Sequence, residues 1–194
     1  MRPITVPILL AAFAACSDTP TEYTTPLVVS GPEMQARTDG DRNLTTHLEG
    51  SQEVPARDTR ATGQAVYHIS KDGNSVEYKV IVANINNVFM SHIHIGPPGA
   101  NGPIAVWLYP STAQVPGAPG GGPINGVIAS GTFTAADLTA PAGAWDGTWE
   151  SLLAAIRSGG AYTNVHTNDG VDPANTGPGD FPGGEIRGQF KGGS

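Results

Sequence analysis

Residues 63–83 read GQAVYHISKDGNSVEYKVIVA and contain two alternating runs separated by a short turn. Ala65, Tyr67 and Ile69 occupy every second position of the first run, and the second run repeats the pattern from Val76 onward. Because neighbouring side chains of a strand point to opposite faces, each run predicts a strand with one buried face. The segment KDGN between them is typical of a hairpin, so we expect the two strands to pair antiparallel.

Similar short runs fill the chain on both sides of this hairpin. They predict further strands at residues 44–49, 89–95, 103–109, 127–133, 161–167 and 184–190. One helix is expected at residues 148–158, where apolar residues follow helical spacing, and a single turn is expected after Thr134. The 26 glycines and 17 prolines disfavour a helical bundle. The sequence therefore predicts an all-β, antiparallel Greek-key sandwich or barrel with one or two short helices at an end.

Charge and cysteine content exclude several classes of function. The net charge of −7 argues against nucleic acid as a partner, because binding to phosphates needs a basic surface. Cys16 is the single cysteine, which excludes an internal disulfide and any cysteine-clustered metal site. A domain of this kind depends on its apolar core for stability.

The first residues have the pattern of an export signal. Arg2 precedes an apolar run at residues 4–13, and two alanines stand directly before Cys16. This resembles a bacterial lipoprotein signal, which implies that residues 1–15 are removed, Cys16 is lipidated and residues 16–43 form a flexible tether. The alternative is an ordinary secretion signal with an incidental cysteine. Both predict an exported protein of the cell envelope, in the periplasm or at the outer-membrane surface, and the first implies membrane contact through a lipid anchor only.

Four motifs carry a family resemblance. They are LEGSQEVP at residues 48–55, SHIHIG at 91–96 followed by NGP at 101–103, YTNVHT at 162–167 and GGEIRGQ at 183–189. Together they resemble the chordin-type CHRD domain, which we expect to occupy residues 44–194. The family name by itself supplies no function. The acidic, tethered and loop-rich design of the chain favours a binding or interaction module with a protein or glycan partner at the cell surface, and we predict no catalytic residue.

Histidines in two of these motifs suggest a metal site. His92 and His94 are two positions apart on a predicted strand and share one face, while Ile93 enters the core. His166 comes from a later strand. Imidazole suits copper and zinc, so the three histidines form a candidate site for copper, with zinc as the alternative.

The same pattern resembles copper/zinc superoxide dismutase, which is also a β-sandwich. The expected fold is therefore either immunoglobulin-like or superoxide dismutase-like. That resemblance implies His92, His94 and His166 as copper ligands and Arg187 as a guide for an anionic substrate. No histidine stands between His94 and His166 to bridge a second metal, so a mononuclear site is the most that is implied.

Simpler interpretations stay open for each of these residues. The histidines could lie on a solvated sheet face, and Glu185 could form an ion pair with Arg187 that fixes loop register. Three functions follow: a surface binding module, a mononuclear copper protein for storage or superoxide-type chemistry, and a structural envelope lipoprotein. Whether the protein is an enzyme is left undecided by the sequence.

Overall fold

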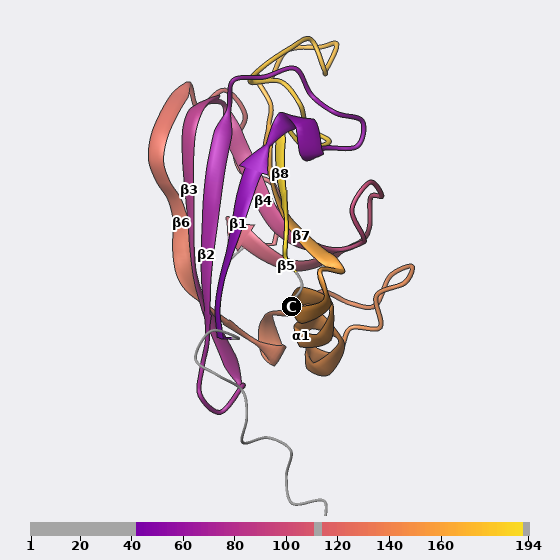
Figure 1. Ribbon diagram of the computed structural model, residues 1–194. Helices are drawn as coiled ribbons and strands as arrows, with labels where there is room; N and C mark the ends of the chain where they lie inside the picture. Colours follow the sequence, from indigo (N-terminus) through magenta and orange to yellow (C-terminus); the bar gives the residue numbers. More distant parts are fainter. Residues whose placement is uncertain (1–41, 111–113, 192–194) are drawn as a thin grey trace, which may run out of the picture. The chain divides into compact units, whose positions relative to one another are not determined.

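The computed structural model describes residues 42–110 and 114–191. Within them, eight strands form one antiparallel sheet in the order β5-β4-β7-β8-β1-β2-β3-β6 (Figure 1). In chain order the strands are β1 (Asn43–Glu49), β2 (Thr62–Ile69), β3 (Ser75–Asn86), β4 (Val88–Ile95), β5 (Ile104–Tyr109), β6 (Pro123–Thr134), β7 (Ala161–Thr167) and β8 (Ile186–Gln189). The all-β prediction is confirmed. The predicted signal peptide, Cys16 and almost all of the predicted tether lie outside the described residues.

The predicted hairpin forms as expected. β2 and β3 pair antiparallel along their length, from Thr62 opposite Ala83 to Ile69 opposite Val76. Within the turn, the Asp72 carboxylate accepts hydrogen bonds from the Asn74 backbone and side chain, which is how aspartate stabilises a tight turn.

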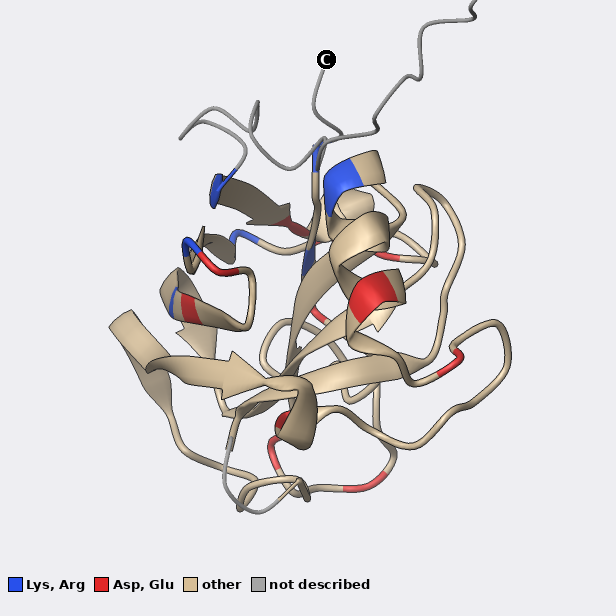
Figure 2. Ribbon diagram, turned by 90° about the horizontal axis from the view of Figure 1, so that it is seen from below, with Lys and Arg blue, Asp and Glu red and all other residues tan. Residues whose placement is uncertain are grey.

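Helical segments begin and end at the residues that the sequence indicates. Helix α1 (Trp149–Ser158) starts after Thr148, whose hydroxyl accepts from the Ser151 N–H, and ends at Gly159 in the left-handed conformation. It carries an acidic residue in its first turn and a basic residue in its last turn, and both charges interact favourably with the helix dipole (Figure 2). A 3-10 turn, η4 (Ala135–Asp137), has the expected capping box, and a further one, η3 (Gly50–Gln52), follows β1. In the described part of the chain, no helix has both the length and the apolar character needed to cross a bilayer.

The sheet curls into a nearly closed barrel around the apolar core. Tyr78 of β3 donates its hydroxyl hydrogen to the Leu108 carbonyl of β5 at 2.9 Å, and Val106 of β5 bridges to Leu138 just beyond η4. These contacts bring β5, at one end of the sheet order, next to β3 and to the segment after β6, near the other end. Fully buried apolar side chains fill the interior, among them Leu48, Ile69, Val80, Ile93, Leu152, Val165 and Ile186.

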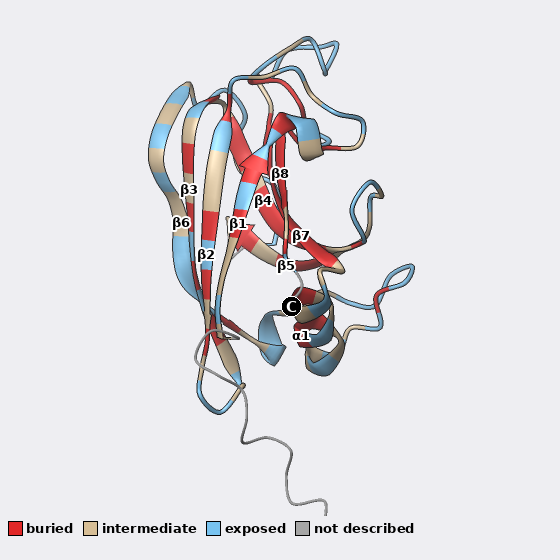
Figure 3. Cartoon of the chain, in the orientation of Figure 1, coloured by how far each residue is buried: buried red, intermediate tan, exposed pale blue. Residues whose placement is uncertain are grey.

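The outer face of part of the sheet is buried as well. Every residue of β7 is buried and most of β4 and β8 are, whereas β1 and β2 alternate between buried and more exposed positions (Figure 3). Loops at residues 50–61, 96–103 and 168–185 are tied across this region, for example by the Asn101 side chain, which donates to the Val54 carbonyl at 2.7 Å. The expectation of a solvated histidine face is therefore wrong, because loops cover the polar side of these strands.

Candidate metal centre

Strand register brings the three histidines to one face. In the pairing of β4 with β7, His94 lies opposite Tyr162, His92 opposite Asn164 and Met90 opposite His166. Alternate residues of a strand share a face, so the histidines of β4 and the one of β7 lie on the same, loop-covered side of the sheet.

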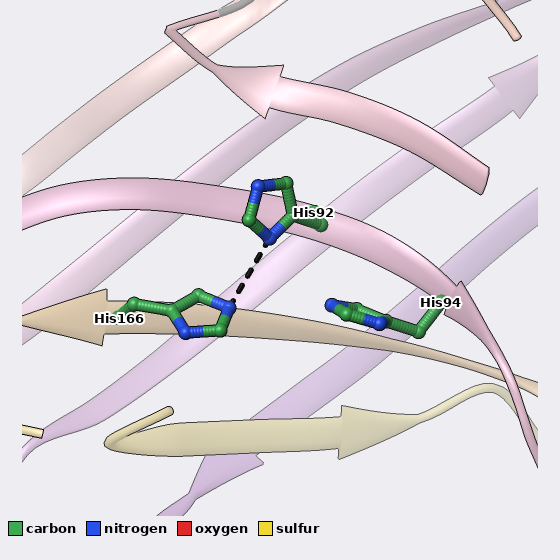
Figure 4. Close-up of side chains that lie close together, drawn as sticks. All are labelled: His92, His94 and His166. Carbon is green, nitrogen blue, oxygen red and sulfur yellow. Dashed lines mark hydrogen bonds between the residues drawn. The ribbon is translucent and has the colours of Figure 1, made fainter. Parts of the chain in front are cut away.

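The three imidazole rings converge on one point. One ring nitrogen of each histidine lies within 4.8 Å of the others, and the rings face one another across the two strands (Figure 4). His92 Nδ1 and His166 Nε2 are 3.1 Å apart. Two nitrogens bound to one metal at about 2.0–2.1 Å are separated by roughly 3–4 Å. Small movements of the rings would therefore let one ion contact all three.

Backbone carbonyls orient two of the rings. His94 Nδ1 is 2.8 Å from the Gly102 carbonyl oxygen, and His166 Nδ1 is 2.9 Å from that of Pro182. Since a carbonyl only accepts, each Nδ1 carries hydrogen and each Nε2 presents a lone pair. In the metal-free protein His92 Nδ1–H then donates to His166 Nε2. For both of these nitrogens to bind one ion, His92 must carry its hydrogen on Nε2 instead, so that the ion replaces this hydrogen bond. His94 and His166 are held as metal-binding histidines are, by a hydrogen bond from the ring nitrogen that does not bind the ion.

Burial keeps the three rings neutral. His92 is 0% exposed, and burial, aided by repulsion from the other two histidines, lowers its pKa to about 2. Burial lowers the pKa of His166 to about 3 and that of His94 to about 4, against the opposing effect of the carbonyls that they contact. At neutral pH all three therefore have the uncharged form that a metal ion requires.

Two of the ring nitrogens are left without hydrogen-bond partners among the described residues. Nε2 of His92 and Nε2 of His94 are both buried and make no hydrogen bond of normal geometry, although the Asn164 side chain lies close enough to His94 to oppose the lowering of its pKa. A buried polar atom without a partner costs free energy, so it needs an explanation such as a ligand or a water. For His94, the unpartnered atom is the same nitrogen that its Gly102 hydrogen bond leaves free.

Aromatic rings enclose the cluster. The Trp107 ring of β5 meets the His92 ring edge-on at 4.2 Å between centroids, and Phe89 approaches His166 in the same manner at 6.4 Å. Tyr162 stacks parallel to His94, with centroids 4.9 Å apart. Packing against these neighbouring rings therefore fixes the orientation of each imidazole.

Glu185 and Arg187 are buried beside the cluster and bind different partners. The Glu185 carboxylate accepts from the Thr59 and Thr167 hydroxyls at 2.6 Å each, and from the Gly179 N–H. The Arg187 guanidinium donates to the Pro97 and Ala100 carbonyls and to Gln189. Both side chains thus tie loops to the sheet.

The structure adds residues that the sequence prediction did not assign to the site. Tyr162 and the carbonyl groups of Gly102 and Pro182 hold the rings in place. Tyr162 was detectable, since it lies four positions before His166 on the same strand face. The carbonyls were not, because loop conformation determines where they point. By contrast, His47 is exposed and His68 half-buried, in keeping with their lack of an assigned role.

Comparison with known proteins identifies the family of the chain. No curated protein and no solved structure matches it. The family model described as CHRD domain matches residues 44–190, which include all strands but the first residue of β1 and all three clustered histidines. The chain therefore belongs to the CHRD domain family.

Proposed function

We propose that this protein is an exported, lipid-anchored CHRD-domain protein that binds one copper ion through His92, His94 and His166. The observation that carries the proposal is the convergence of three buried imidazoles, with one nitrogen of each within 4.8 Å of the others. The export signal and Cys16 supply the location and the anchor.

The donor set favours copper over other ions. All three ligands are neutral imidazoles, which suit copper and zinc and are poor ligands for calcium or magnesium. Between the two suitable metals, copper binds a nitrogen site more tightly in the general order of divalent affinities. Zinc would be the competing occupant in a metal-binding experiment.

Burial of the site supports retention of an ion in preference to turnover of a substrate. His92 is fully buried, and three protein ligands are enclosed by aromatic rings. Arg187 is 1% exposed and its guanidinium donates to protein acceptors, so it is poorly placed to attract a dissolved anion. We therefore propose copper storage or delivery at the cell surface as the role of the site.

The test is copper binding by the full chain carrying Cys16→Ser, which removes the competing thiol. Purified without a histidine tag and loaded with copper, it should hold one copper per chain by elemental analysis, with nitrogen hyperfine structure in the Cu(II) spin resonance spectrum. His92→Ala/His94→Ala should abolish this binding. His47→Ala is the matched control, because His47 is exposed and lies opposite Gln64 of β2, outside the histidine cluster. Equal copper in the double variant and the control would refute the proposal.

A further inference from the structure

Three side chains form a column that ends at the metal-binding rings. The Arg187 guanidinium carbon lies 3.4 Å from the centroid of the Tyr162 ring. On its other side, Tyr162 stacks on His94 with an angle of 4° between the ring planes. A cation, a phenol ring and an imidazole are therefore layered in that order, and we call them the Arg187 column.

Hydrogen bonds hold the column in place without neutralising its charge. Arg187 donates to the carbonyl oxygens of Pro97 and Ala100 at 2.9 and 3.0 Å, and to the Gln189 side-chain oxygen at 2.9 Å. All three acceptors are uncharged. The same loop fixes the rings, since the Gly102 N–H donates to the Tyr162 hydroxyl and the Gly102 carbonyl accepts from His94.

Glu53, the carboxyl group that interacts electrostatically with Arg187, is only partly ionised at neutral pH. Glu53 is buried and interacts electrostatically with Arg187 and Arg57, yet burial raises its pKa to about 7. One of its carboxylate oxygens, Oε1, has no hydrogen-bond partner among the described residues. With three neutral histidines as ligands, the positive charge of Arg187 is thus only partly offset where an ion would bind.

A fixed positive charge in a buried site favours the lower charge state of a bound ion. The charge repels Cu(II) twice as strongly as Cu(I), because the repulsion is proportional to the charge of the ion. Groups around a metal site adjust its reduction potential in this way. We infer that the Arg187 column shifts the preference of this site toward Cu(I) relative to Cu(II). The inference rests on the proposed copper-binding function and specifies the oxidation state of its ligand.

The ratio of Cu(I) affinity to Cu(II) affinity tests the inference. Both affinities are measured at pH 8 on the full chain carrying Cys16→Ser, by competition with bicinchoninate for Cu(I) and with nitrilotriacetate for Cu(II). A unit charge roughly 10 Å from the ion, at an effective dielectric constant of about 20, changes this ratio by roughly tenfold. Arg187→Met, which keeps a long apolar chain over Tyr162, should lower the ratio by about that factor.

Two further variants separate charge from structural damage. Glu53→Gln removes the counter-charge and should move the ratio upward, opposite to Arg187→Met. Lys79→Met, the control, removes an exposed positive charge on β3 and should leave the ratio unchanged. An unchanged ratio in both Arg187→Met and Glu53→Gln, with copper still bound, overturns the role of the Arg187 column alone. Failure of the parent chain to bind either copper ion overturns the proposed function itself.

Discussion

At the scale of single residues, His92, His94 and His166 link stability to pH. Each has a pKa in the folded protein below the 6.5 of an exposed histidine, because burial disfavours its charged form. As pH falls below about 6.5, the unfolded chain binds three protons that the folded chain does not. Stability is therefore fully present above that pH and is lost as pH falls toward the folded values.

Glu53 has the opposite effect on this pH dependence. Its pKa is raised to about 7 by burial, so in the same pH range the folded protein holds one proton that the unfolded chain releases. The net difference is about two protons, which corresponds to a loss of roughly 3 kcal/mol in the free energy of unfolding per pH unit between about pH 6 and 5. Urea unfolding of metal-free protein at several pH values measures this slope.

Three variants assign the slope of stability against pH to these groups. His94→Gln should make it shallower by about one proton, whereas His47→Ala should leave it unchanged because His47 is exposed. Glu53→Gln should make it steeper by about one proton. A free energy of unfolding that stays level from pH 7 to 5 would show that the histidines are not held neutral by burial.

At the scale of elements, the loop at residues 96–103 determines the geometry of the site. Gly102 packs so tightly that a Cβ atom there would overlap the Ile95 carbonyl oxygen. Its backbone also bonds to both His94 and Tyr162. Gly102→Ala must therefore displace the loop, and we expect it to cost more than about 2 kcal/mol of stability and to weaken copper binding.

Gly121→Ala is the control for this substitution, because a Cβ at Gly121 would meet no atom within 4 Å. It should change the stability by less than about 0.5 kcal/mol. Denaturant unfolding and copper titration of both variants make the comparison. Wild-type stability and affinity in Gly102→Ala would mean that the loop does not position the rings.

Element boundaries show which structural features sequence periodicity could predict. The strands around the 63–83 hairpin and helix α1 follow from alternation, helical spacing and capping residues, and the structure confirms them. β6 was expected from residue 127 but begins at Pro123, inside a glycine-rich stretch. Its start is set by pairing with the long strand β3, where Ile85 lies opposite Ile124. The residues around position 123 do not indicate this pairing, because strand formation depends on the neighbouring strand as well as on local composition.

The candidate site was predictable only in part, for a similar reason. Alternation places His92 and His94 on one face, but it does not say whether water or a loop covers that face. The covering loops belong to distant parts of the sequence, as the hydrogen bond from Arg57 to the Gly184 carbonyl shows. Hence the sequence was enough to select the three histidines as candidates, whereas their burial and the Arg187 column could be recognised only in the folded structure.

At the scale of the whole molecule, Cys16 should decide where the copper-binding domain resides. In a bacterial host that processes lipoproteins, we expect the wild-type chain to incorporate a labelled fatty acid and to fractionate with membranes. Cys16→Ser should remove both properties and leave copper stoichiometry at one per chain, since the cluster lies in the CHRD domain. Membrane fractionation that persists in Cys16→Ser would contradict lipid anchoring at this residue.

The most direct test of copper binding at these three histidines is X-ray absorption at the copper edge, on the copper-loaded full chain carrying Cys16→Ser. We predict a first shell of imidazole nitrogens at about 2.0 Å, with the outer-shell scattering of three histidine rings. His166→Ala should reduce that outer-shell scattering by about a third or abolish binding. A spectrum without imidazole scattering, or one that His166→Ala leaves unchanged, would contradict the assignment of His92, His94 and His166 as the copper ligands.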